Sequence, residues 1–265
     1  MDSLPPIVSV EWLASALDNP DLVVCDVRAY LDGRVGREAY DDGHICGARF
    51  IDLDTVLAGA PGPGVGRHPL PSPEDFASGL AVAGIDHHTT VVAYDDSGGM
   101  IAGRLVWMLR ILGQPAALLD GGIQAWPDPL DTEEPNFSPS APQPRPWPTD
   151  AVVDAQSVDA HIAAGGVVVD SRGPDRYEGQ HEPIDPVAGH IPGAINLPFV
   201  ENLVAGRFHA TDVLVERFEN AGVDEHTIFY CGSGVSACNN LLAAEAAGRG
   251  LGRLYVASWS GYCTR

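Results

Sequence analysis

The sequence predicts an α/β fold of two tandem domains, each a mainly parallel sheet flanked by helices. Three observations support this prediction: the chain is an internal repeat, short apolar strands alternate with helical stretches in each copy, and a proline-rich segment separates the copies. With 265 residues the chain is long enough for two domains. We expect an N-terminal domain over 1–126, a linker over 127–149 and a C-terminal domain over 150–265.

The first repeated element is an apolar strand that ends in Asp-x-Arg. It covers residues 22–28 in the first copy and 167–172 in the second. A short, mostly apolar run is typical of a strand that is buried on both faces of a parallel sheet. Because Arg28 and Arg172 occur in both copies, we expect each to form a structural salt bridge with a neighbouring acid.

The second repeated element is a turn that begins Gly-His-Ile. Residues 189–194 read Gly-His-Ile-Pro-Gly-Ala, whereas residues 43–48 have Cys46 in place of the proline. We expect Cys46, like Cys25, to be a buried structural thiol.

Each copy continues with a strand, a helix and a further strand. The expected ranges are 90–95, 102–112 and 117–122 in the first copy, and 227–231, 237–247 and 253–258 in the second. The same 25 residues separate Asp95 from Asp120 and Cys231 from Val256, as expected for a duplicated domain. Between the copies, the proline-rich residues have no periodicity, which is typical of an extended, semi-rigid linker.

Composition and charge narrow the function classes. The net charge of −21 argues against nucleic acid or an anionic membrane as a partner. The sequence has no run of about 18 apolar residues, so we expect no membrane span. The first residues lack the basic and apolar regions of a signal peptide, and we therefore expect a cytoplasmic protein. The five cysteines form no Cys-x-x-Cys pair, so neither a zinc site nor a disulfide scaffold is expected.

Cys231 is the candidate nucleophile. It ends an expected strand and precedes a glycine-rich loop and the start of a helix. Backbone N–H groups in such a loop and the positive end of the helix dipole favour thiolate, the nucleophilic form. The alternative is a buried structural cysteine in a glycine-rich turn. Asp95 has the equivalent place in the first copy, and a carboxylate has no thiol chemistry, so we expect one site per chain.

The two Gly-His-Ile turns, the cysteine loop and the two-fold repeat together resemble those of the two-domain rhodaneses, a sulfurtransferase family. The resemblance covers nearly the whole chain. It implies two rhodanese-like domains, of which the N-terminal one is inactive and has an aspartate at the cysteine position.

Within this family, residues 231–237 resemble the loop of the 3-mercaptopyruvate sulfurtransferases, apart from a serine in place of a threonine. Thiosulfate sulfurtransferases carry basic residues there instead. A loop without cationic side chains has to hold its anion mainly through backbone N–H groups. The expected substrate-binding loop residues are Gly232, Gly234, Val235, Ser236 and Ala237.

The resemblance also implies a Ser–His–Asp relay beside the cysteine, formed by Ser233, His68 and Asp54. Sulfur transfer out of mercaptopyruvate leaves pyruvate enolate, which a histidine oriented by a carboxylate can protonate. The alternative for His68 is a solvated loop histidine next to a proline. Arg176 matches an arginine that binds the substrate carboxylate in a bidentate manner.

Two segments depart from the family pattern. A second carboxylate-binding arginine is expected shortly before Gly189, but residues 181–188 contain none, and Ile184 stands near its place. Residues 256–259, Val-Ala-Ser-Trp, replace the usual Asp-Gly-Ser-Trp, and we expect this change to loosen the loop next to the site.

We therefore expect an enzyme that moves a sulfane sulfur from 3-mercaptopyruvate, through a Cys231 persulfide, to cyanide or to a thiol such as thioredoxin. No metal or organic cofactor is expected. The alternatives are a thiosulfate:cyanide sulfurtransferase and a persulfide carrier or binding module without turnover. A cysteine phosphatase is disfavoured, because its Cys-x5-Arg pattern needs an arginine where Ala237 stands.

Overall fold

The computed structural model describes residues 4–265, which divide into two compact units. The first unit comprises the described residues through Gly59 together with Pro71–Trp147. The second comprises Pro148–Arg265 and also Ala60–Leu70, a short segment from the N-terminal half of the chain. We call residues 60–70 the inserted segment. Because of it, His68 belongs to the same unit as Cys231.

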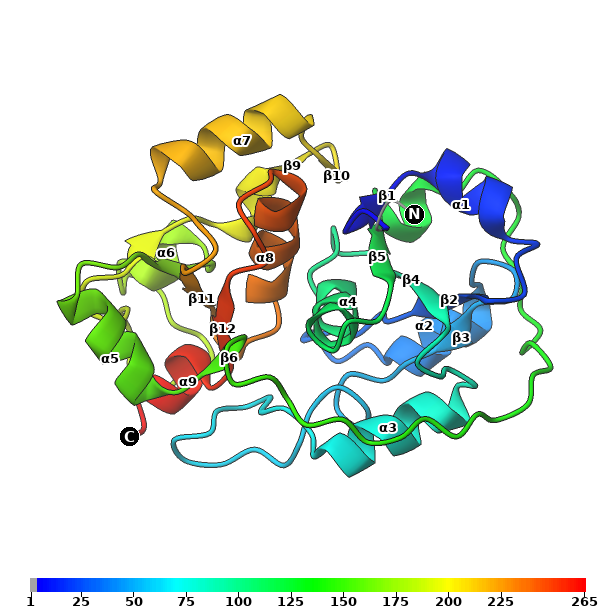
Figure 1. Ribbon diagram of the computed structural model, residues 1–265, viewed down its shortest axis with the longest axis horizontal. Helices are drawn as coiled ribbons and strands as arrows, with labels where there is room; N and C mark the ends of the chain where they lie inside the picture. The colour runs from blue at the N-terminus through cyan, green and yellow to red at the C-terminus, as the bar shows by residue number, and fades with distance from the viewer. Residues whose placement is uncertain (1–3) are drawn as a thin grey trace. The chain divides into compact units, whose positions relative to one another are not determined.

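The described part of the first unit is built on a five-stranded parallel sheet with helices against it (Figure 1). Its strands are β1 (Ile7–Val8), β2 (Leu22–Asp26), β3 (Arg49–Phe50), β4 (Thr90–Tyr94) and β5 (Ala116–Leu119). They lie in the order β1-β5-β4-β2-β3, with neighbouring strands parallel. Its helices are α1 (Val10–Ala16), α2 (Gly36–Asp42), α3 (Pro73–Val82), α4 (Ala102–Ile111) and the 3-10 turn η1 (Gly122–Ala125).

The second unit repeats this architecture. Its sheet consists of β6 (Val152–Val153), β7 (Val168–Asp170), β8 (Ile195–Asn196), β11 (Ile228–Tyr230) and β12 (Arg253–Tyr255). Its helices are α5 (Ala155–Ala163), α6 (Pro174–Tyr177), α7 (Thr211–Asn220), α8 (Ala237–Ala246), α9 (Ser258–Tyr262) and the 3-10 turn η2 (Phe199–Asn202). An antiparallel hairpin joins β9 (Leu203–Val204) to β10 (Arg207–Phe208). The parallel order β6-β12-β11-β7-β8 matches that of the first sheet position by position, which confirms the predicted α/β fold in two copies.

The Asp-x-Arg pattern is explained by a buried ion pair at the end of a strand. Arg172 Nη2 lies 2.6 Å from Asp170 Oδ2 and donates to the carbonyl oxygen of Gly189 at 2.7 Å. Arg28 forms the same ion pair with Asp26 at 2.6 Å in the first unit. These contacts fasten the strand to the Gly-His-Ile turn, so the prediction of structural salt bridges is confirmed.

The Gly-His-Ile turns also recur in three dimensions. The His190 ring stacks on Tyr177 with 3.8 Å between ring centroids, and its Nδ1 lies 2.7 Å from the Tyr177 carbonyl oxygen. The N–H of Ile191 donates to the hydroxyl of Tyr230, the last residue of β11, at 3.1 Å. His44 stacks in the same way on its own tyrosine in the first unit. The turn therefore contacts the end of β11, directly before Cys231.

Of the thiols outside the Cys231 position, Cys25 and Cys238 are fully buried. Burial raises the pKa of the Cys25 thiol to about 12, which makes this side chain inert at neutral pH. The expectation of a buried Cys46 is wrong, because the structure places this residue at an exposed corner of its turn. Pro192, which has the same place in the second turn, is exposed as well.

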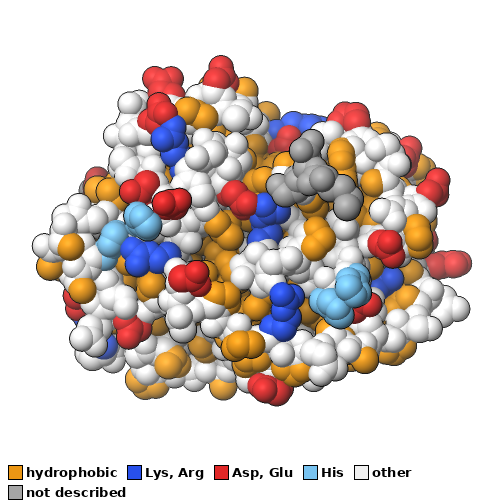
Figure 2. All heavy atoms as spheres, in the orientation of Figure 1, with side chains coloured by type: hydrophobic (Ala, Val, Ile, Leu, Met, Phe, Trp, Pro, Cys, Tyr) orange, Lys and Arg blue, Asp and Glu red, His pale blue; other side chains and the backbone are white. Residues whose placement is uncertain are grey.

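Among residues 4–265, no helix is both long and apolar enough to cross a membrane. On the face drawn in Figure 2, acidic side chains are scattered over the surface rather than gathered in one patch. Since the sequence contains no lysine, every Lys/Arg-coloured side chain on that face is an arginine.

Candidate active site

Cys231 follows β11 at the carboxyl end of the second sheet and is only 2% exposed. Its N–H donates to Ser258 Oγ at 3.1 Å, and its carbonyl oxygen accepts the N–H of Trp259 at 3.0 Å. Ser258 adopts a φ of 53°, a left-handed conformation that is uncommon for a residue with a side chain. Ser258 and Trp259 therefore hydrogen-bond the backbone of Cys231 on both sides, and the expected loosening of this loop stays a prediction.

The glycine-rich loop directs a backbone N–H at the sulfur of Cys231. The N–H of Gly234 donates to Cys231 Sγ, with 3.2 Å between nitrogen and sulfur. Gly234 has a φ of 76°, which glycine adopts without strain and which turns its N–H back toward the sulfur. A hydrogen bond to sulfur from a backbone donor stabilises the anionic form of a thiol.

Ser233 and His68 meet beside the cysteine. His68 Nδ1 lies 2.8 Å from Ser233 Oγ, and Ser233 is only 8% exposed. His68 comes from the inserted segment, so a residue 165 positions away in sequence reaches the loop within one unit. This contact disfavours the alternative of a solvated loop histidine. Asp54, in contrast, belongs to the first unit, and its place in the relay stays a prediction.

Two guanidinium groups lie against Gly232, the residue that follows the cysteine. A Cβ placed on Gly232 would stand 2.9 Å from Arg67 Nη2 and 3.4 Å from Arg176 Nη1. Arg176 lies in α6, whereas Arg67 lies in the inserted segment next to His68. Although the loop itself carries no cation, guanidinium groups from two other segments therefore line the Cys231 site.

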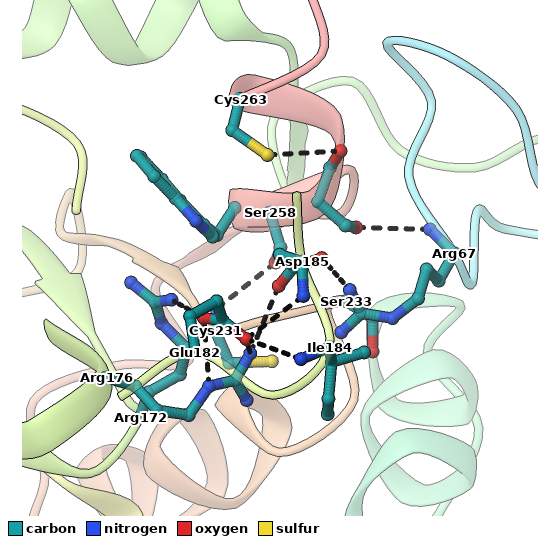
Figure 3. A network of polar contacts seen from close by, with 12 residues as sticks. Arg67, Arg172, Arg176, Glu182, Ile184, Asp185, Cys231, Ser233, Ser258 and Cys263 are labelled. Carbon is teal, nitrogen blue, oxygen red and sulfur yellow. Dashed lines mark hydrogen bonds and ion pairs between the residues drawn. The ribbon is translucent and has the colours of Figure 1, made fainter. Parts of the chain in front are cut away.

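Two buried acids hold these arginines in place. Arg176 Nη2 lies 2.7 Å from Glu182 Oε1 and 3.1 Å from Asp185 Oδ2, and Arg67 Nη1 pairs with Asp185 Oδ1 (Figure 3). Both carboxylate side chains are no more than 3% exposed. Ile184, where the resemblance places an arginine, is 44% exposed and donates its N–H to Glu182 Oε1 at 3.1 Å.

The two acids respond differently to this environment. Burial alone would raise the pKa of Glu182, but hydrogen bonds from Arg176 and from backbone N–H groups bring it below the ordinary value. Burial raises the pKa of Asp185 above its ordinary value, in spite of the opposing charges of Arg67 and Arg176, and the nearby Glu182 adds to the rise. The Asp185 carboxylate is therefore the more easily protonated member of the pair.

Residues 4–265 contain no group of three or more histidine, cysteine, aspartate or glutamate side chains that could hold a metal ion.

A protein-family model described as a rhodanese-like domain matches residues 9–128 and 154–264. The chain belongs to the rhodanese family. A crystal structure of a 3-mercaptopyruvate sulfurtransferase from Escherichia coli matches this chain with a TM-score of 0.84 and 29% identity, over 97% of this chain and 99% of that one. The rhodanese fold in two copies is therefore supported by both sequence and structure.

Relatives of this rhodanese carry two kinds of name. A Pseudomonas aeruginosa protein named "Probable 3-mercaptopyruvate sulfurtransferase" is 41% identical, over 97% of this chain and 95% of its own. The 3-mercaptopyruvate sulfurtransferase of Escherichia coli is 32% identical over the same shares. A Mycobacterium tuberculosis protein with a provisional name as a thiosulfate sulfurtransferase is 36% identical, over 96% of this chain and 92% of its own.

Sequence reasoning missed three residues of the site: Arg67, Glu182 and Asp185. One signal could have found the two acids. The segment 181–188 has acids where the rhodanese pattern has an arginine, and buried acids require partner cations. No local pattern marks Arg67, because its contact with Asp185 joins segments that lie 118 residues apart in the sequence.

Proposed function

We propose that this rhodanese is a sulfurtransferase that takes a sulfane sulfur from 3-mercaptopyruvate onto Cys231 and passes it to a thiol or to cyanide. The observation that carries the proposal is the combination at Cys231: a backbone N–H on the sulfur, a hydroxyl–imidazole pair beside it, and two guanidinium groups at Gly232. In this arrangement the Cys231 sulfur is the nucleophile, the hydroxyl–imidazole pair is the proton donor, and the guanidinium groups bind the anionic substrate.

In the first half-reaction, the Cys231 thiolate attacks the sulfur atom of the donor. The sulfur–sulfur bond forms while the carbon–sulfur bond breaks, and the electron pair of that bond leaves with carbon as pyruvate enolate. His68 and Ser233, 2.8 Å apart, supply the proton that converts the enolate to pyruvate, directly or through water. The N–H of Gly234 stabilises the anionic sulfur before attack and the persulfide after it.

In the second half-reaction, an acceptor thiolate attacks the outer sulfur of the Cys231 persulfide and Cys231 leaves as a thiolate. A dithiol protein such as thioredoxin suits this step, and cyanide would yield thiocyanate. No external oxidant is needed, because the carbon of the donor takes the electron pair of the broken carbon–sulfur bond: the sulfur is oxidised to the persulfide level while that carbon is reduced to the methyl group of pyruvate. We place the protein in the cytoplasm, since its five cysteines are free thiols and suit a reducing compartment.

Substrate binding is assigned to Arg176 and to the loop residues around the cysteine. A guanidinium group matches the geometry of a carboxylate, and Arg176 reaches Gly232. The loop backbone from Gly232 to Ala237 then surrounds the transferred sulfur. The relay is completed by Asp54, which the resemblance assigns to orienting His68.

A comparison of two donors tests the proposal. Pyruvate release from 3-mercaptopyruvate and thiocyanate formation from thiosulfate are measured for the wild type and for Cys231→Ser. We expect a higher kcat/KM with mercaptopyruvate, loss of both activities in the variant, and one added sulfur atom on Cys231 by mass spectrometry. Full pyruvate release by Cys231→Ser would overturn the proposal, and a persulfide without multiple turnover would point to a sulfur carrier.

Thiosulfate is the second candidate donor, because the guanidinium groups at Gly232 can also donate hydrogen bonds to the oxygens of this anion. The name of the Mycobacterium tuberculosis relative, a thiosulfate sulfurtransferase, supports this alternative. A kcat/KM that is higher with thiosulfate than with mercaptopyruvate would select it.

A further inference from the structure

We propose that Arg67 supplies the second guanidinium for the donor carboxylate and that it works together with Arg176. The proposal rests on the sulfurtransferase function proposed for Cys231. The resemblance leads one to expect an arginine near Ile184, and the sequence has none there. In the structure, a guanidinium from a different segment reaches the residue after the nucleophile, with Arg67 Nη2 only 2.9 Å from where a Gly232 Cβ would be.

The backbone of the inserted segment fixes Arg67 at this place. Gly66 has a φ of +86°, and a Cβ there would approach the carbonyl oxygen of Ala257 to 2.5 Å, so only glycine permits the contact. The N–H of Arg67 donates to Ser260 Oγ at 3.1 Å. The inserted segment thus packs against α9, whose residue Trp259 also donates its N–H to the carbonyl oxygen of Cys231. The same helix therefore positions both Arg67 and Cys231.

Asp185 indicates what ligand this pair of arginines can bind. Its two oxygens accept from different guanidinium groups, one from Arg67 and one from Arg176 at 3.1 Å (Figure 3). The Asp185 side chain is 2% exposed, whereas those of Arg67 and Arg176 are 30% and 19% exposed. A guanidinium has five N–H donors, so a carboxylate on the buried side leaves donors for a second one on the open side.

The charge balance of the cluster favours a monoanionic ligand. Asp170, Glu182 and Asp185 together offset the positive charges of Arg67, Arg172 and Arg176, but they do not use up the N–H donors of Arg67 and Arg176. Glu182 and Asp185 accept from Nε and Nη2 of Arg176, and Asp185 accepts from Nη1 of Arg67. Binding is then governed by the remaining N–H donors of the two arginines more than by net charge, which suits one carboxylate better than a dianion. Arg67 is in this way a determinant of specificity for a 2-oxo acid donor.

The test uses two donors that differ only in the carboxylate: 3-mercaptopyruvate, and mercaptoacetone, in which a methyl group replaces it. For Arg67→Ala, we expect KM for mercaptopyruvate to rise roughly tenfold to a hundredfold, the factor that one charge-assisted hydrogen bond carries. KM for mercaptoacetone should change less than about threefold, since that donor offers no charged acceptor. Arg67→Lys, which keeps the charge but loses the fork geometry, should fall between wild type and Arg67→Ala.

Two further variants separate substrate binding from support of the fold. Arg67→Ala combined with Asp185→Asn removes the buried carboxylate that would otherwise lose a partner, and we expect the KM penalty to persist. Arg265→Ala removes an arginine that pairs with Asp159 in the same unit, and it should keep wild-type KM for both donors. Urea unfolding of each variant confirms that the fold is intact.

Recovery of wild-type KM in the double variant would overturn the inference, because Arg67 would then only neutralise Asp185. An equal loss with both donors would also overturn it. Neither result touches the proposed function, which fails only if the wild type does not turn over mercaptopyruvate through Cys231.

Discussion

The loops at Asp95 and at Cys231 occupy the same place in the two units, yet one holds a carboxylate and the other a thiol. Asp95 follows β4 and accepts backbone N–H bonds at 2.8–2.9 Å from Ser97, Gly99, Ile101 and Ala102. Cys231 follows β11 and accepts the N–H of Gly234 at 3.2 Å. Both loops therefore direct backbone N–H groups at the side chain that follows the strand, four of them at the carboxylate of Asp95 and one at the sulfur of Cys231.

The shared backbone explains why the replacement is tolerated. The third residue after each side chain is a glycine with positive φ, 68° at Gly98 and 76° at Gly234. Burial raises the pKa of Asp95, although the four backbone donors oppose the rise. The comparison shows that the same strand–loop–helix unit turns backbone N–H groups toward the side chain after the strand in both units, and we infer that the residue type at this one position decides between a structural and a chemical role.

The largest effect is expected from making the second loop like the first. Cys231→Asp places a carboxylate in the second loop, where the N–H of Gly234 can donate to it. The variant lacks the Cys231 sulfur, which carries the transferred sulfur atom in the proposed reaction. We expect pyruvate release from mercaptopyruvate to fall by on the order of a thousandfold or more while the protein stays folded. Activity comparable to the wild type in this variant would show that the chemistry lies elsewhere.

The next effect concerns the hydroxyl–imidazole pair at the second loop. We expect His68→Ala to lower kcat for pyruvate release by about a hundredfold, the range of a lost general acid. His68→Asn, which keeps a donor near Ser233, serves as the matched control for packing. A loss that appears in KM alone, with kcat unchanged, would contradict a role in proton transfer.

Much of this comparison could be predicted from the sequence, because it depends on local patterns. The apolar strands, the glycine-rich loop and the helix that starts at Ala237 follow from residues that are adjacent in the chain. The ion pairs of Arg28 and Arg172 were predictable because a repeated Asp-x-Arg pattern brings both partners within two residues.

The rest could not be predicted, because it depends on contacts between distant segments. The sequence does not show that residues 60–70 leave the first unit and pack beside Cys231, so Arg67 was overlooked. The tight contact of Ser258 with Cys231 depends on a left-handed backbone at a serine, which propensity disfavours. The exposure of Cys46 follows from which corner of its turn faces outward, and composition does not carry that information.

A third prediction concerns the first loop and affects stability rather than activity. Asp95→Asn turns one carboxylate oxygen into an N–H₂ donor that faces backbone N–H groups, so buried donors lose their acceptor. We expect a loss of about 1–3 kcal/mol in the free energy of unfolding, measured with urea. Turnover per folded molecule should be unchanged, and Asp96→Asn next to it is the matched control. Wild-type stability in Asp95→Asn would mean that the first loop does not depend on the anion.

The smallest effect is a slope in the pH dependence of stability, carried by the buried carboxylate of the second unit. Asp185 has a pKa raised by burial above the ordinary value of 3.8. As pH rises from that value through the raised one, the unfolded chain releases the proton before the folded protein does, so the Asp185 contribution to stability falls. Asp185→Asn cannot titrate, so the stability of the wild type relative to the variant should fall with pH over this window. Urea unfolding at closely spaced acidic pH values measures the slope. We expect a shallow slope, because the charges of Arg67 and Arg176 oppose the effect of burial on the pKa of Asp185. A slope of the opposite sign would mean that the pKa of Asp185, like that of Glu182, lies below its ordinary value.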